Sequence, residues 1–155
     1  MEIISQSPVA TVIFFFILAT SIYAFYANPT LLRKLMLHPF SIHRNRKLYG
    51  LLSSGFAHAD WNHLLFNSFT FFFFAFELER IIGHWQFAVV YFGGLFLSDI
   101  STIIKYKNNT GYYSLGASGA ISAVLFSYIL FLPLTKIYLF IIPIGIPAYI
   151  FAGLF

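Results

Sequence analysis

The strongest constraint on the fold is a series of long apolar runs without charged residues. The first run, Val9 to Ala27, is about 19 residues long, which is enough to cross a hydrocarbon core of about 30 Å at 1.5 Å rise per residue. Hydrophobic residues make up 59% of the chain and charged residues 9%, so a soluble domain built from it would expose large apolar patches. The sequence therefore excludes a soluble globular domain and predicts an integral, multi-pass membrane protein.

The runs predict an all-α bundle of transmembrane helices that forms one domain over residues 1–155, with four complete spans and a fifth begun. Asp60 is placed to cap the second span. Pro143, Gly145 and Pro147 are incompatible with one straight helix, so the fifth helix is expected to start at Pro147, too close to the end of the chain to cross the membrane. We therefore expect the domain to be incomplete at its C-terminus. The four expected spans are Val9 to Ala27, Trp61 to Leu78, Trp85 to Ile104 and Ser114 to Leu132.

The charged residues are mostly basic and are concentrated in the first loop. Nine Lys and Arg against five Asp and Glu give a formal net charge of +4. Because the loop from Thr30 to Gly55 mixes its basic residues with apolar ones, it is typical of a segment at a membrane surface rather than of a nucleic-acid interface. Cysteine is absent, which excludes disulfides and a cysteine nucleophile.

Two groups of polar residues fall inside the predicted spans, where such side chains are costly. His63 and Asn67 are four residues apart, so on a helix they lie on one face and both can donate hydrogen bonds. Ser118 is flanked by Gly116, Ala117, Gly119 and Ala120, whose small size lets a helix or an extended peptide approach its hydroxyl. Each group alone has a plainer explanation: a packing serine bonded to its own backbone, and a polar clamp between helices.

Together these residues resemble the rhomboid intramembrane serine proteases. The segment from His58 to Asn67 is similar to the family's H-x-x-x-N pattern on the second span, and Gly116-Ala117-Ser118-Gly119 is similar to G-x-S-G at the start of the fourth. Glu79-x-x-x-Gly83 also resembles a family feature. In contrast, Tyr49-Gly50 stands where many bacterial relatives have Trp-Arg.

The resemblance implies a site for peptide-bond hydrolysis within or beside the bilayer. It makes Ser118 the nucleophile and makes His63 and Asn67 donors to the oxyanion, with Gly116, Gly119 and His58 as expected substrate-binding residues. We expect no cofactor, no metal site and no nucleic-acid partner; the expected partners are transmembrane protein substrates and the lipid bilayer. The family's base is a His on a sixth span, so the 155 residues alone are expected to be inactive.

Several alternatives stay open from the sequence. A catalytically inactive rhomboid-like protein that binds membrane clients would keep the spans without the base, and a transporter fragment would show an internal repeat, which we do not find. Aspartyl catalysis through Asp99 would need a second aspartate on a facing span. Counting positive charges places the amino terminus outside, whereas the resemblance places it inside, and we follow the resemblance.

Overall fold

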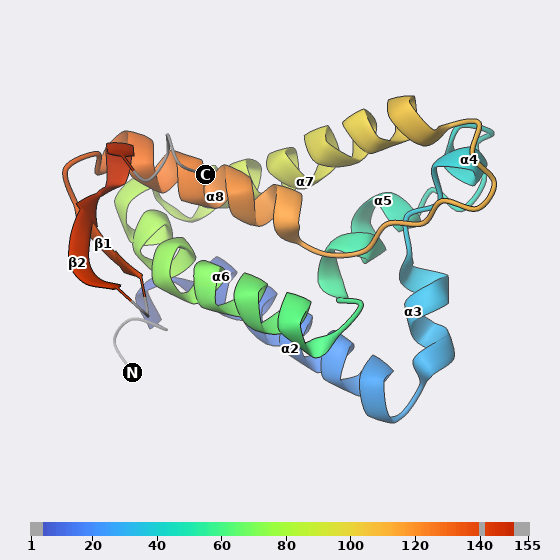
Figure 1. Ribbon diagram of the computed structural model, residues 1–155, viewed down its shortest axis with the longest axis horizontal. Coiled ribbons are helices and arrows are strands. Elements are labelled where there is room, and N and C mark those ends of the chain that lie inside the picture. The colour runs from blue at the N-terminus through green and yellow to red at the C-terminus, as the bar shows by residue number, and fades with distance from the viewer. Residues whose placement is uncertain (1–4, 140–141, 151–155) are drawn as a thin grey trace.

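The computed structural model describes residues 5–139 and 142–150, and most of these residues are helical. Four helices form a bundle, in which α8 packs on α7 and on α6, and α2 packs on α6 (Figure 1). Shorter helical turns fill the long first loop. The bundle consists of α2 (Pro8–Tyr26), α6 (Trp61–Ile82), α7 (His84–Tyr106) and α8 (Ser118–Phe131), and the loop contains α3 (Pro29–Leu35), α4 (Pro39–Ile42), α5 (Gly50–Ser53) and the 3-10 helix η1 (Ser54–Phe56).

Helix boundaries follow local chemistry at most positions. The Asp60 carboxylate accepts a hydrogen bond from the His63 backbone N–H at 2.8 Å, which confirms the predicted cap of α6. Gly83, with φ of 92°, separates α6 from α7 by a conformation that L side chains rarely adopt. The third predicted span is one unbroken helix, in which Gly94 lets the backbone of α8 approach closely.

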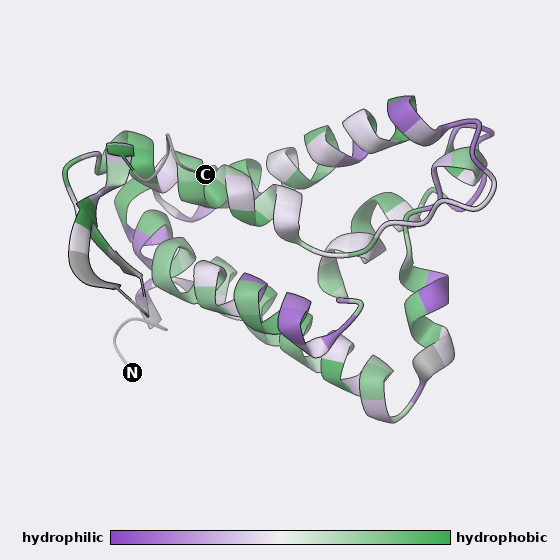
Figure 2. Cartoon of the chain, viewed as in Figure 1, coloured by the Kyte–Doolittle hydropathy of each residue, from purple (hydrophilic) through white to green (hydrophobic). Residues whose placement is uncertain are grey.

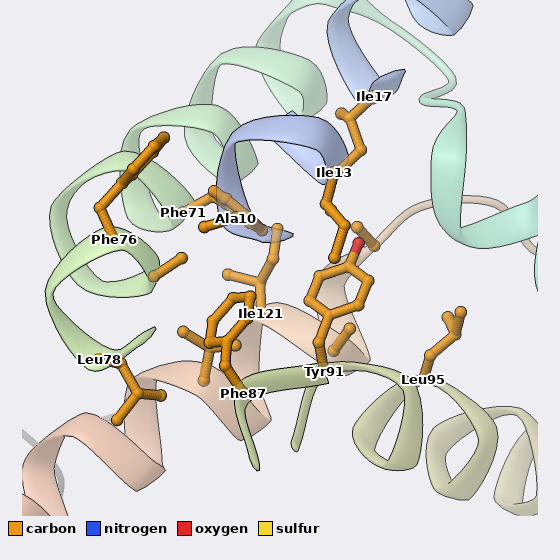
Figure 3. Close-up of a cluster of buried hydrophobic side chains, with 14 of the residues drawn as sticks. Ala10, Ile13, Ile17, Phe71, Phe76, Leu78, Phe87, Tyr91, Leu95 and Ile121 are labelled. Atoms are coloured by element: carbon orange, nitrogen blue, oxygen red, sulfur yellow. The ribbon is translucent and has the colours of Figure 1, made fainter. Parts of the chain in front are cut away.

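The core of the bundle consists of apolar side chains from all four long helices. Figure 3 shows side chains of this cluster from different helices, among them Ile13 of α2, Phe71 of α6 and Tyr91 of α7. The rings of Phe71 and Tyr91 meet edge to face, with centroids 5.8 Å apart. Such contacts add to the burial of large apolar surface, and they fix α6 against α7.

Length and apolar composition suit two of these helices for crossing a membrane, α2 and α7. The α6 helix is long enough, but Asn62, His63 and Asn67 make its first two turns polar. The α8 helix has 14 residues, about 21 Å at 1.5 Å per residue. The predicted fourth span was therefore wrong at its start: the helix begins at Ser118 rather than at Ser114, and the expected count of four spans stays a prediction.

The C-terminal part departs from the all-α prediction. Residues Lys136–Leu139 (β1) and Ile142–Pro147 (β2) pair as two antiparallel strands, and helical conformation resumes at residues 148–150. The reason is chemical: a segment with two prolines and a glycine cannot hold a continuous helical hydrogen-bond ladder. The prediction that one straight helix is excluded here is confirmed. The rest of the expected fifth helix, residues 151–155, lies outside the described residues.

The first loop is tied to the segment that precedes α8. Leu37 and Ser114 exchange backbone hydrogen bonds of 2.9 and 3.0 Å. The His38 ring is buried and stacks on Tyr113 at 4.3 Å between centroids, with its nitrogens near the Ser41 hydroxyl and the Thr110 carbonyl. His38 is thus an internal contact between the two loops.

Candidate active site

The site starts at the first two turns of α6. Asp60 caps the helix, and His63 and Asn67 follow on one face, four residues apart. The two side chains are half-buried. This is the arrangement that the i, i+4 spacing predicted.

His58 lies behind this face as a fully buried side chain between α2 and α6. Its Nε2 accepts a hydrogen bond of 2.8 Å from the Asn67 amide nitrogen, and its Nδ1 lies 3.2 Å from the Ser21 hydroxyl oxygen. Because Asn67 donates to Nε2, the ring proton is on Nδ1, which donates to Ser21. Both ring nitrogens are thus engaged within the protein. The expected role of His58 at the substrate stays a prediction, and its observed contacts orient Asn67.

Burial lowers the pKa of His58 to about 4, with the neighbouring His63 adding to the shift and Asp60 opposing it. The ring is therefore neutral at neutral pH, as its hydrogen-bond pattern requires. A neutral acceptor at Nε2 holds one N–H of the Asn67 amide and leaves the second N–H for another acceptor.

His63 lies against the turn that leads into α8. A Cβ atom placed on Gly116 would lie 2.5 Å from His63 Cε1 and 2.8 Å from Nε2, so the imidazole occupies the space that any other residue at 116 would fill. Gly116 has φ of 125° and its N–H donates to the Ser54 carbonyl at 2.9 Å. The His63 ring is also edge-on to the His58 ring, with centroids 4.9 Å apart. The structure thus brings the two sequence motifs together.

Ser118 is the first residue of α8 and its side chain is exposed. The preceding Ala117 supplies no side-chain cap, so among the described residues the N–H groups of the first turn have no side-chain acceptor. Uncapped N–H groups and the helix dipole favour negative charge at this end. Within residues 5–139 and 142–150 the Ser118 hydroxyl forms no hydrogen bond to a histidine.

Gly119 serves packing in this structure. A Cβ atom there would overlap the Ser98 side chain of α7, and one on Gly94 would overlap the Ala123 Cβ of α8. These two glycines let α7 and α8 approach closely. The expected role of Gly119 in substrate binding stays a prediction. In the part of the chain that the structure describes, no group of three or more His, Asp or Glu side chains is placed to hold a metal ion.

The comparison with known families decides the family of the chain. The sequence model of the Rhomboid domain matches residues 45–155. The chain belongs to the rhomboid family. The matched region contains α6, the turn at Gly116 and all of α8, and the two apolar helices agree with an integral membrane protein.

One curated relative is similar over part of the rhomboid chain. It is a Bacillus subtilis (strain 168) protein named "Putative rhomboid protease YdcA", 39% identical over 92 residues. The matched residues make up 59% of this chain and 45% of YdcA, so the chain spans less than half the length of that relative.

Sequence reasoning missed several residues around the site. Ser21, from α2, holds His58 from a position 37 residues away in the chain. Ser54, from η1, accepts from Gly116. Neither residue belongs to a motif, and the only signal for Ser21 was a hydroxyl inside an otherwise apolar span.

Proposed function

We propose that this rhomboid chain carries the nucleophile and the oxyanion site of an intramembrane serine protease that hydrolyses peptide bonds of transmembrane substrates. The observation that carries the proposal is the position of the His63 ring against Gly116, two residues before Ser118 and at the uncapped start of α8. Donors from α6 and from the α8 backbone then converge where negative charge would develop during acyl transfer.

The proposed chemistry divides the roles among four residues. The Ser118 hydroxyl attacks the substrate carbonyl, and its proton passes to a general base, which a serine nucleophile requires. His63 and Asn67 donate hydrogen bonds to the oxyanion, and His58 positions Asn67 through its Nε2. Among the described residues no histidine shares a hydrogen bond with the Ser118 hydroxyl, so the base is assigned to none of them.

The length of α8 supports access of water to Ser118. A helix of about 21 Å falls about 9 Å short of a 30 Å hydrocarbon core. If the C-terminal end of α8 lies at one membrane surface, Ser118 lies below the other. Irregular backbone such as residues 112–117 is tolerated at that depth where it lines a hydrated cavity or is covered by protein. Hydrolysis needs such a water-accessible site.

Cleavage in a defined bilayer tests the proposal. The full-length protein is reconstituted into liposomes together with single-span membrane proteins as substrates. The cleavage products are mapped by mass spectrometry. We expect cleavage in or next to the substrate's apolar segment and complete loss of cleavage with Ser118→Ala. Replacing His63 or Asn67 by Ala should lower kcat by about 10²–10³-fold with a smaller change in KM.

A second reading, an inactive rhomboid-like protein that binds membrane clients, predicts a different result. Clients would co-purify equally with the wild type and with Ser118→Ala, and neither would cleave them. That outcome would overturn the protease proposal.

A further inference from the structure

A pocket of about 560 Å³ lies where the first loop meets the segment before α8. Three separate parts of the chain form it: α3, the residues just before α5, and the loop between α7 and α8. The volume is in the range of small-ligand sites. The lining residues are Thr30, Arg33, Lys34, Lys47, Tyr49 and Tyr113.

The pocket is cationic and contains no carboxylate. Among the described residues, ion pairs involve only Glu77 and Glu79 as acids, both near the far end of α6. Arg33, Lys34 and Lys47 therefore have no acidic partner in that part of the chain. Three uncompensated cations around one cavity favour an anion, and a guanidinium beside ammonium groups suits a phosphate, which accepts several charge-assisted hydrogen bonds.

The two tyrosines complete a site for a phosphate. Tyr113 is held in place by the stacked His38 ring, 4.3 Å away between centroids. Tyr49 also lines the pocket and is 55% exposed. Phenolic hydroxyls donate hydrogen bonds to phosphate oxygens without adding charge.

Lys47 reaches the pocket from a costly backbone conformation. Its φ is 54°, in the left-handed region that is unfavourable for a non-glycine residue and is often found at functional sites. The Lys47 carbonyl accepts a hydrogen bond of 3.0 Å from Gly50, which begins α5. The turn thus directs the chain back toward α3 at the position of a cationic side chain.

The surroundings favour a lipid as the source of the phosphate. Leu48, between Lys47 and Tyr49, and Leu52, three residues after Tyr49, are 50% and 44% exposed, which suits contact with acyl chains. In Figure 2, hydrophilic residues gather at the end of the molecule that holds α3, α4 and the end of α7, beside apolar ones. Basic residues at such a surface are attracted electrostatically to anionic lipid headgroups.

We propose that this pocket binds the phosphate of an anionic phospholipid headgroup, with Arg33, Lys34 and Lys47 as its ligands. The site is separate from Ser118 and does not depend on the protease proposal. It shares Tyr113 with the loop that leads to α8.

Lipid retention tests the pocket directly. The purified complete protein is titrated with phosphatidylglycerol or phosphatidylcholine, and bound lipid is counted by native mass spectrometry. Arg33→Gln with Lys47→Asn removes two pocket charges; Asn tolerates the left-handed conformation at 47. Arg46→Gln with Lys107→Gln is the matched control, with the same change in net charge outside the pocket. We expect the pocket variant to lose about 10-fold or more of its phosphatidylglycerol affinity and the control less than about 3-fold.

Cross-linking of the wild type keeps the test independent of variant folding. A phosphatidylglycerol with a photoreactive headgroup should label peptides that contain residues 30–34, 47–49 or 113. Several results would overturn the proposal: equal losses in both double variants, equal retention of phosphatidylcholine, or labels elsewhere. Binding of inorganic phosphate as tight as that of the lipid, or displacement of the lipid by an acidic peptide of matched charge, would assign the pocket to a different ligand.

Discussion

At the residue scale, the site shows what a motif predicts and what it leaves out. The spacing of His63 and Asn67 fixes their common face, and Asp60 was predictable as the cap because its chemistry is local. The contact between His58 and Asn67 joins a loop to a helix, and Ser21 comes from another helix entirely. Contacts of this kind depend on tertiary packing, so no pattern of neighbouring residues could have predicted them.

Acid should destabilise the protein through His58. The pKa of His58 is about 4 in the folded protein and about 6.5 in an unfolded chain. Between these values the unfolded state binds more protons, so stability falls as the pH drops from 6.5 to 4, by up to about 3 kcal/mol. Thermal unfolding in detergent across this range measures the effect.

The control for this prediction is a second histidine in the same protein. His58→Gln should flatten the pH dependence even if the variant is less stable at neutral pH, whereas His43→Gln, at an exposed position, should leave it unchanged. An unaltered slope in His58→Gln would show that His58 is not the titrating group.

Gly116→Ala should impair catalysis without touching a reacting group. The added Cβ would lie 2.5 Å from His63 Cε1 on a backbone with φ of 125°, so the ring must shift away from the oxyanion. A misplaced donor costs about 10²-fold in kcat. Gly93→Ala is the control, because a Cβ there meets no atom within 4 Å. Unchanged kcat in Gly116→Ala would remove His63 from the proposed mechanism.

At the element scale, helix ends were less predictable than helix positions. The start of α8 moved from Ser114 to Ser118 because Ser114 pairs with Leu37 and the positive φ of Gly116 interrupts any helix. The apolar, small-residue composition of residues 114–120 gave no sign of this. Likewise, the prolines after Pro133 excluded a helix but did not specify that β1 and β2 would pair.

A buried carboxylate holds the start of α2 against the end of α6. Glu79 is fully buried, accepts from the Val9 and Ala10 N–H groups at 3.1 and 2.6 Å, and meets the His84 ring at 2.6 Å. Glu79 therefore caps the start of α2 from a position about 70 residues away along the chain. The resemblance of Glu79-x-x-x-Gly83 to a family feature singled out Glu79, but nothing in the sequence identified α2 or His84 as its partners.

Glu79→Ala should destabilise the bundle because it leaves two buried donors unpaired, at a cost of about 1–3 kcal/mol each. Glu77→Ala is the matched control on the same helix: its carboxylate pairs with Arg80 at 2.9 Å with 44% of the side chain exposed, so its loss should cost less than about 1 kcal/mol. The two melting temperatures are compared in one detergent. Equal shifts would contradict the role of Glu79 as a cap.

At the scale of the whole molecule, composition predicted a membrane protein and the motifs predicted the rhomboid family, which the family model over residues 45–155 confirms. The sequence did not reveal how the first loop meets the α7–α8 loop through Leu37, His38 and Tyr113, because these contacts join segments about 75 residues apart. That junction positions both the basic pocket and the turn before Ser118. Contacts between distant segments thus determine the surroundings of the site, although its central residues can be recognised from the local sequence.

The central claim, that Ser118 is the nucleophile, is tested most directly by covalent labelling. The full-length protein in a bilayer is treated with an active-serine phosphonate, digested, and analysed by mass spectrometry. We expect one adduct, on the peptide that contains Ser118. Its formation should be slowed in His63→Ala and abolished in Ser118→Ala, and the Ser118→Ala protein should retain its thermal stability. Equal labelling of the Ser118→Ala protein, or an adduct on another residue, would contradict it.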